Sequence, residues 1–191
     1  MSKTLTSIAQ KPNLIMLSDM WGLKRSAWIS NYLKQLHDSF DIMLIDCIDI
    51  AKINDNNLNE QELHQRFVEG GVELAVQNLI DISPSDSYIL GFSIGGYIAW
   101  KACLAGLKAK SLFAVSSTRL RKEESRPSMP IQLFYGQTDP YLPENLWFDQ
   151  MNINPQIYVN MGHNCYMDKE NATSISSLLI GSLLTSDKHS R

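Results

Sequence analysis

The sequence contains few cysteines, and those present form no recognisable set. Cys47, Cys103 and Cys165 are odd in number, widely spaced and without a C-x-x-C pair. This excludes the disulfide framework of a small secreted domain and the common spacings of a zinc site. Residues 1–11 also lack the apolar run of a signal peptide. We therefore expect reduced thiols, no bound metal and a cytoplasmic location.

Long apolar runs and an excess of one charge are also missing. The stretch 171–186 carries no charged side chain, but it is rich in Ser and Thr and shorter than the about 20 apolar residues of a bilayer-spanning helix. We expect no membrane span. The 17 Lys and Arg are nearly balanced by 20 Asp and Glu, for a formal net charge of -3. This overall charge does not favour binding to nucleic acid.

The composition is that of a folded globular protein. Hydrophobic residues make up 44% of the chain and charged residues 19%, which excludes disorder over most of its length. A chain of 191 residues can bury about 70% of its unfolded surface in one core. There is no internal repeat and no linker-like segment, so we expect a single domain over residues 1–191.

Six short apolar runs predict the strands of a buried parallel sheet. They cover residues 13–18, 41–47, 87–92, 111–117, 131–136 and 156–160. Their hydrophobicity is nearly continuous, as expected for strands that are covered on both faces. The sequence therefore predicts an α/β fold, with a doubly wound, mostly parallel six-stranded sheet and helices on both faces.

Amphipathic segments between these runs predict the covering helices. They cover residues 28–36, extend from 59 toward 80, cover 94–104, and begin again near 168. Asn59 and Glu62 have the spacing of a capping box, and Gly70-Gly71 is expected to break or kink the second helix. The polar stretches 50–59 and 118–130 are expected to be surface loops.

The most informative motif is the G-x-S-x-G of residues 91–95, which falls between a buried strand and an amphipathic helix. Such a turn, called a nucleophile elbow, holds the serine in a strained backbone conformation. Side chains at Gly91 or Gly95 would collide with neighbouring backbone, which explains the glycines. The alternative is an ordinary strand-to-helix turn in which the glycines serve packing and Ser93 caps the helix.

A serine alcohol is a weak nucleophile near neutral pH, so it needs a base and a third group that orients the base. Asp139 follows the fifth predicted strand and His163 follows the sixth. The chain order serine, acid, histidine is typical of this geometry on a doubly wound sheet. The other histidines, His37, His64 and His189, do not follow strands and are interpreted as solvated or capping residues.

On these motifs the chain resembles the α/β-hydrolase superfamily over roughly residues 13–185. The resemblance rests on YILGFSIGGYIAW around the serine, YGQTDPYLP around the acid and NMGHN around the histidine. It implies that Ser93 attacks a carbonyl group, that His163 transfers the proton and that Asp139 orients the imidazole. It further implies cleavage of a carboxylic ester or thioester through an acyl-enzyme, with no metal or organic cofactor.

The resemblance also implies two backbone N–H groups that stabilise the oxyanion. One is expected from Ile94 and the other from the loop after the first strand, where Met20 is the first choice. Its neighbour Trp21 is the alternative. Many members of the superfamily have His-Gly where this chain has Ser18-Asp19, and Asp19 is interpreted here as a loop former.

Many relatives insert a helical cap where this chain has only residues 118–130, so we expect no cap domain and an open site. Arg119 and Arg121 in this stretch are candidates for binding an anionic substrate, although a solvated loop is the alternative. Tyr141, Leu142, Trp147 and Phe148 are candidates for the wall of an acyl pocket, with core packing as the alternative, and Trp21 is a further substrate-binding candidate.

The expected partner is a small acyl ester or thioester, and an acidic acyl carrier protein is a second candidate. The alternative from another class is a protein that binds a small molecule or a partner on a hydrolase scaffold without turnover.

Overall fold

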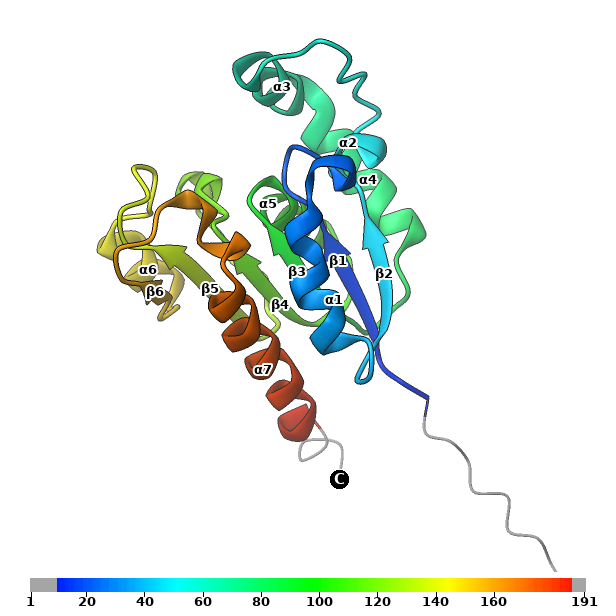
Figure 1. Cartoon of the computed structure of the whole chain (residues 1–191), viewed down its shortest axis with the longest axis vertical. Helices are drawn as coiled ribbons and strands as arrows, with labels where there is room; N and C mark the ends of the chain where they lie inside the picture. Colours follow the sequence, from blue (N-terminus) through cyan, green and yellow to red (C-terminus); the bar gives the residue numbers. More distant parts are fainter. Residues whose placement is uncertain (1–9, 187–191) are drawn as a thin grey trace, which may run out of the picture.

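The computed structural model describes residues 10–186, which form one six-stranded parallel sheet with helices on both faces (Figure 1). The strands are β1 Asn13–Leu17, β2 Asp41–Ile45, β3 Ser87–Phe92, β4 Ala109–Val115, β5 Ile131–Gly136 and β6 Gln156–Tyr158. Their order is β2-β1-β3-β4-β5-β6, and every neighbouring pair is parallel. This confirms the predicted fold class. The single domain predicted over residues 1–191 includes ends outside the described residues and stays a prediction.

Seven α-helices lie between and after these strands in the described residues. They are α1 Ser30–Leu36, α2 Cys47–Ile50, α3 Glu60–Arg66, α4 Val72–Ile82, α5 Ile94–Leu104, α6 Asn145–Met151 and α7 Lys169–Ser186. Short helical turns complete the set: η1 Leu23–Arg25, η2 Ala27–Ile29, the π-helical η3 Phe67–Gly71, η4 Thr118–Lys122 and η5 His163–Met167.

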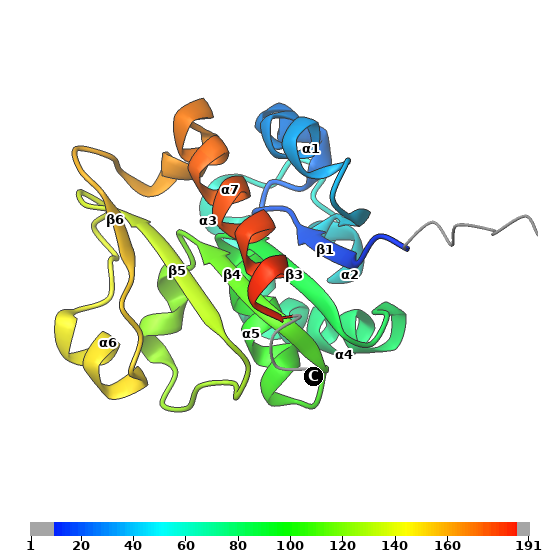
Figure 2. The ribbon, with the colours of Figure 1, turned by 90° about the horizontal axis from the view of Figure 1, so that it is seen from below.

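The sheet is covered on both faces, as the apolar strands require. Helices α1 and α7 lie on one face, and α4, α5 and α6 lie on the other (Figure 2). Strand β3 is buried along its whole length. Its Leu90 and Phe92 pack toward α1 and α7, whereas Ile89 packs toward α4 and α5. Side chains of a strand alternate between faces, so one apolar run serves both cores.

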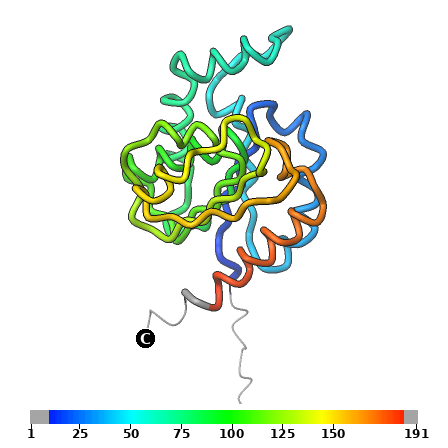
Figure 3. Tube along the Cα trace, turned by 90° about the vertical axis from the view of Figure 1, so that its left-hand side faces the viewer, coloured from blue at the N-terminus to red at the C-terminus, as the bar shows by residue number. Residues whose placement is uncertain are grey.

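The segment between β2 and β3 contains the predicted capping box and the predicted kink. The Asn59 side chain accepts a hydrogen bond from the Glu62 backbone, and the Glu62 carboxylate accepts one from the Asn59 backbone. Gly70 adopts φ 124°, which divides the segment into α3 and α4. Helix α3 projects from the rest of the molecule as a result (Figure 3).

Several boundaries differ from the prediction for local reasons. Strand β2 ends at Ile45 because Asp46 caps α2 by accepting the N–H groups of Ile48 and Asp49. Strand β4 ends at Val115 because Ser116 adopts φ 51°. The expected surface loop 118–130 contains η4, and Leu120 within it is fully buried.

No helix within residues 10–186 is long and apolar enough to cross a membrane.

We predict opposite effects on stability for two glycine-to-alanine substitutions. A Cβ at Gly95 would collide with the Ser18 carbonyl oxygen and with Leu17. Gly95→Ala should therefore lower the free energy of unfolding by about 1–3 kcal/mol. Gly181 lies exposed in α7, and a Cβ there meets nothing within 4 Å. Gly181→Ala should raise the free energy of unfolding by about 1 kcal/mol. Urea titration measures both, and equal effects would contradict the close packing of α5 on β1.

Candidate active site

Ser93 occupies the sharp turn between β3 and α5. Its backbone lies at φ 50° and ψ −115°, a region that residues other than glycine rarely adopt. Two hydrogen bonds hold this conformation: the Ser93 N–H donates to the Val115 carbonyl at 2.8 Å, and the Ser117 hydroxyl donates to the Ser93 carbonyl at 2.8 Å. The turn also needs Gly91, because a Cβ there would overlap the Gly96 backbone. The local geometry is that of a nucleophile elbow.

His163 and Asp139 meet Ser93 at the same edge of the sheet. The Ser93 Oγ lies 3.0 Å from the His163 Nε2, and the His163 Nδ1 lies 2.7 Å from the Asp139 Oδ2. The Asp139 side chain is fully buried, and its second oxygen accepts the N–H of Tyr141 at 2.9 Å. An Nδ1–H that donates to this carboxylate leaves Nε2 free to accept the serine proton. We call Ser93, His163 and Asp139 the hydroxyl–imidazole–carboxylate cluster.

The strand order explains why residues distant in sequence meet here. The chain passes from β1 to β2 on one side and then returns to β3 on the other side of β1. In such sheets, ligand sites form at the carboxyl ends of the strands where the order reverses. Ser93 follows β3 at this point, while Asp139 and His163 follow β5 and β6.

The backbone N–H groups expected to act as oxyanion donors differ in their hydrogen bonding. Ile94 is the first residue of α5, and its N–H donates no hydrogen bond to any described residue. In the loop after β1, the Trp21 N–H donates to the Asp19 carboxylate at 2.9 Å, so it is already occupied. The Met20 N–H makes no hydrogen bond within the described part of the chain. The two candidates thus differ in hydrogen bonding, and the choice of Met20 as oxyanion donor stays a prediction.

The candidate substrate residues lie on segments beside the cluster. The Arg119 guanidinium stacks 5.4 Å from the ring centre of Tyr97, one turn along α5 from Ser93. The Arg121 guanidinium stacks 5.2 Å from the ring centre of Tyr141, two residues after Asp139.

The residues that are candidates for contact with the acyl group differ in their exposure to solvent. Tyr141 is 60% exposed and is free to contact a ligand. Leu142 and Trp21 are half-buried against the apolar core, and Arg25 stacks over the Trp21 ring. Further along, Trp147 and Phe148 belong to the core, on a helix that was not predicted.

Asp19 was interpreted as a loop former, but its burial and its hydrogen bonds exceed what a loop former needs. The sequence did not predict these contacts. It is only 1% exposed, and it accepts a hydrogen bond from the Tyr166 hydroxyl at 3.1 Å. Burial raises the pKa of Asp19, while hydrogen bonds from Trp21, Tyr166 and Ser26 act in the opposite direction. Its position directly after a buried strand was the available signal, but the partner lies far away in sequence.

The other histidines do not reach the cluster. His37 and His64 are exposed. Partial burial and the nearby cations Arg119, Lys122 and Arg121 lower the pKa of His64. His189 lies outside the described residues. Among residues 10–186, no group of three His, Cys, Asp or Glu side chains is arranged to hold a metal ion.

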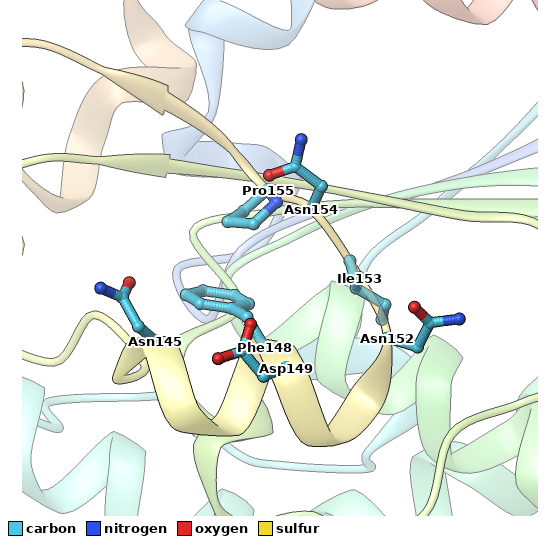
Figure 4. A pocket seen from close by; sticks show the side chains of 7 residues that line it. All are labelled: Asn145, Phe148, Asp149, Asn152, Ile153, Asn154 and Pro155. Atoms are coloured by element: carbon cyan, nitrogen blue, oxygen red, sulfur yellow. The ribbon is translucent and has the colours of Figure 1, made fainter.

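Two open surface pockets lie away from the hydroxyl–imidazole–carboxylate cluster. One, of about 440 Å³, lies between α6 and the start of β6 and is lined mainly by polar side chains such as Asn145, Asp149 and Asn152 (Figure 4). The other, of about 510 Å³, is lined by residues between Ala51 and Leu74. Neither is lined by Ser93, His163 or Asp139.

Comparisons with known proteins connect this geometry to solved structures. No family model and no curated protein matches the sequence. A candidate hydrolase of the α/β superfamily from Xanthomonas campestris pv. campestris is similar at TM-score 0.68 and 17% identity, over 90% of this chain and 99% of that one. A dienelactone hydrolase-like promiscuous phosphotriesterase from metagenomic libraries is similar at TM-score 0.67 and 13% identity, over 91% and 87%. Dienelactone hydrolase from Anabaena variabilis is similar at TM-score 0.65 and 14% identity, over 91% and 86%.

The likeness extends over most of each chain, and residues 10–186 of this protein form the parallel sheet with no cap domain inserted. The protein therefore has the α/β-hydrolase fold.

Proposed function

We propose that the protein is a serine hydrolase that cleaves a carboxylic ester or thioester through an acyl-enzyme. One observation carries the proposal: the Ser93 hydroxyl, on a strained turn, lies 3.0 Å from an imidazole whose other nitrogen lies 2.7 Å from a buried carboxylate. A capping serine would not need a histidine and an acid from two other loops. The hydrolase scaffold of the solved relatives supports the same function.

The geometry supports a two-step reaction. The Ser93 Oγ attacks the carbonyl carbon, and its proton passes to the His163 Nε2. The Asp139 carboxylate stabilises the imidazolium, while the N–H groups of Ile94 and Met20 stabilise the oxyanion. His163 then protonates the departing alcohol or thiol, which leaves the acyl group on Ser93. A water molecule, deprotonated by His163, cleaves this acyl-enzyme and regenerates the serine.

Two arginines on a segment beside the cluster support a class of substrate. The side chains of Arg119 and Arg121 make no ion pair with any described carboxylate. They favour an acyl compound that carries a negative charge, either as a small molecule or on an acidic carrier protein. The three cysteines are all free thiols, which agrees with a cytoplasmic location.

Ser93→Ala tests the nucleophile. The variant should lose labelling by a fluorophosphonate and should lose at least about 10³-fold in kcat on an aryl ester, because it lacks the hydroxyl that forms the acyl-enzyme. Circular dichroism checks that the variant is folded, and Ser30→Ala, at an exposed position of α1, serves as the control that keeps both activities. Persistent labelling of Ser93→Ala would assign the nucleophile elsewhere. A folded wild type that gives no product burst would favour a binding protein on this scaffold.

Thiol reagents should leave the activity unchanged. Burial raises the pKa of Cys165, and it raises the pKa of Cys103 to about 12. Cys47 is fully buried, and its pKa is raised for the same reason. Little reactive thiolate therefore exists at pH 8. Iodoacetamide at this pH should modify the cysteines only after unfolding in urea. Rapid inactivation of the folded enzyme would instead point to Cys165, two residues beyond His163.

Arg119→Ala and Arg121→Ala test the preference for anionic substrates. For an aryl ester with a carboxylate on its acyl chain, each should lower kcat/KM about 5- to 30-fold, whereas the matched neutral ester should change less than about two-fold. Lys110→Ala is the charge control, because Lys110 lies near the opposite end of β4. An equal loss on both esters, or no loss on either, would contradict this preference.

A further inference from the structure

The buried carboxylate of Asp19 joins two parts of the site. One oxygen accepts the Trp21 N–H at 2.9 Å, with the Ser26 hydroxyl at 3.4 Å, and the other accepts the Tyr166 hydroxyl at 3.1 Å. A carboxylate that is 1% exposed is unfavourable unless its oxygens are hydrogen-bonded, and here both are. The side chain is therefore fixed in one orientation by partners in two segments.

The second partner belongs to the segment that carries the histidine. Tyr166 lies in η5, three residues after His163, and is 2% exposed. Its ring meets the imidazole edge-on, with ring centres 6.2 Å apart and planes at 86°. The Tyr32 hydroxyl donates to the Tyr166 carbonyl at 3.0 Å and holds η5 against α1. Asp19 is thus bonded to a rigid support that packs directly against His163.

The first partner sets the course of the loop after β1. With the Trp21 N–H directed at the Asp19 carboxylate, the preceding Met20 N–H has no hydrogen-bond partner in the part of the chain that the structure describes. The same loop lies close to the start of α5, since a Cβ on Gly95 would strike the Ser18 carbonyl. The loop that carries Met20 therefore starts beside the first turn of α5, where Ile94 precedes Gly95.

We propose that Asp19 is a positioning residue, which holds the loop after β1 so that the Met20 N–H acts together with the Ile94 N–H on the oxyanion. This inference rests on the proposed serine hydrolase function. Asp19 itself does not touch the substrate; it binds Trp21 on one side and the η5 support on the other. Catalysis by such donors depends on their placement before the reaction. Release of the loop should therefore reduce stabilisation of the transition state more than it reduces substrate affinity.

Asp19→Ala and Asp19→Asn separate this role from a general loss of structure. Alanine removes the acceptor of the Trp21 N–H, and kcat on an aryl ester should fall on the order of 100-fold while KM changes less than about three-fold. Asparagine keeps an oxygen for the Trp21 N–H and loses only the negative charge and the acceptor for Tyr166. Its kcat should stay within about five-fold of wild type.

Asp46→Ala is the matched control. Asp46 is another carboxylate that accepts a backbone N–H of this loop, from Leu23 at 2.7 Å, and it also caps α2. Its removal should lower the unfolding midpoint in urea but leave kcat within about three-fold of wild type. Near-wild-type kcat in Asp19→Ala would overturn the proposal. Equal losses in Asp19→Ala and Asp19→Asn would also overturn it, because the negative charge rather than the loop bond would then matter.

Amide hydrogen exchange measured by NMR gives a readout that does not require turnover. The Trp21 amide should exchange slowly in the wild type and in Asp19→Asn, and rapidly in Asp19→Ala. Unchanged exchange in Asp19→Ala would contradict the positioning role even in an active enzyme. If the wild type hydrolyses no ester, the proposed function fails, and the exchange data still decide whether Asp19 fixes the loop.

Discussion

The strained backbone of Ser93 is the constraint on which the site depends. A positive φ at a residue with a side chain costs about 1–3 kcal/mol, and the surrounding structure has to supply that energy. It does so through the bonds of Ser93 with Val115 and Ser117 and through close packing at Gly91 and Gly95. These contacts come from β1, β3 and β4. The conformation of the turn therefore depends on how the central strands pack. In this backbone conformation the Ser93 hydroxyl points away from the sheet and toward His163.

The other groups of the site come from loops that the sheet places at one edge. Asp139 is buried and bonded through both oxygens, whereas His163 remains partly exposed, with 34% of its side chain accessible. This difference suits their roles in the proposed reaction: the acid keeps a fixed orientation, and the imidazole meets the substrate. The short interval between β4 and β5 adds only η4, so nothing comparable to a cap domain covers this edge in the described residues.

Much of this arrangement could be predicted from local sequence, and the remainder depends on contacts between distant segments. The apolar runs located all six strands, and the glycines beside Ser93 indicated the elbow, because each signal lies within a few residues. The Met20 and Trp21 donors could not be separated in this way, since backbone N–H groups leave no side-chain trace. In the structure they differ only in hydrogen bonding: the Trp21 N–H donates to Asp19, and the Met20 N–H has no partner within residues 10–186. Helix α6 was missed because its seven residues, 145–151, are too few to show a clear helical periodicity.

The hydrogen bond between Asp19 and Tyr166 joins residues separated by 147 positions in the chain. During synthesis, the elbow and the loop after β1 leave the ribosome long before the histidine segment does. Under the proposed function, the serine of a partly synthesised chain would therefore lack both its proton acceptor and the Tyr166 bond to Asp19. In that reaction, loss of the segment from His163 onward would remove the base and the second anchor of the loop after β1 together.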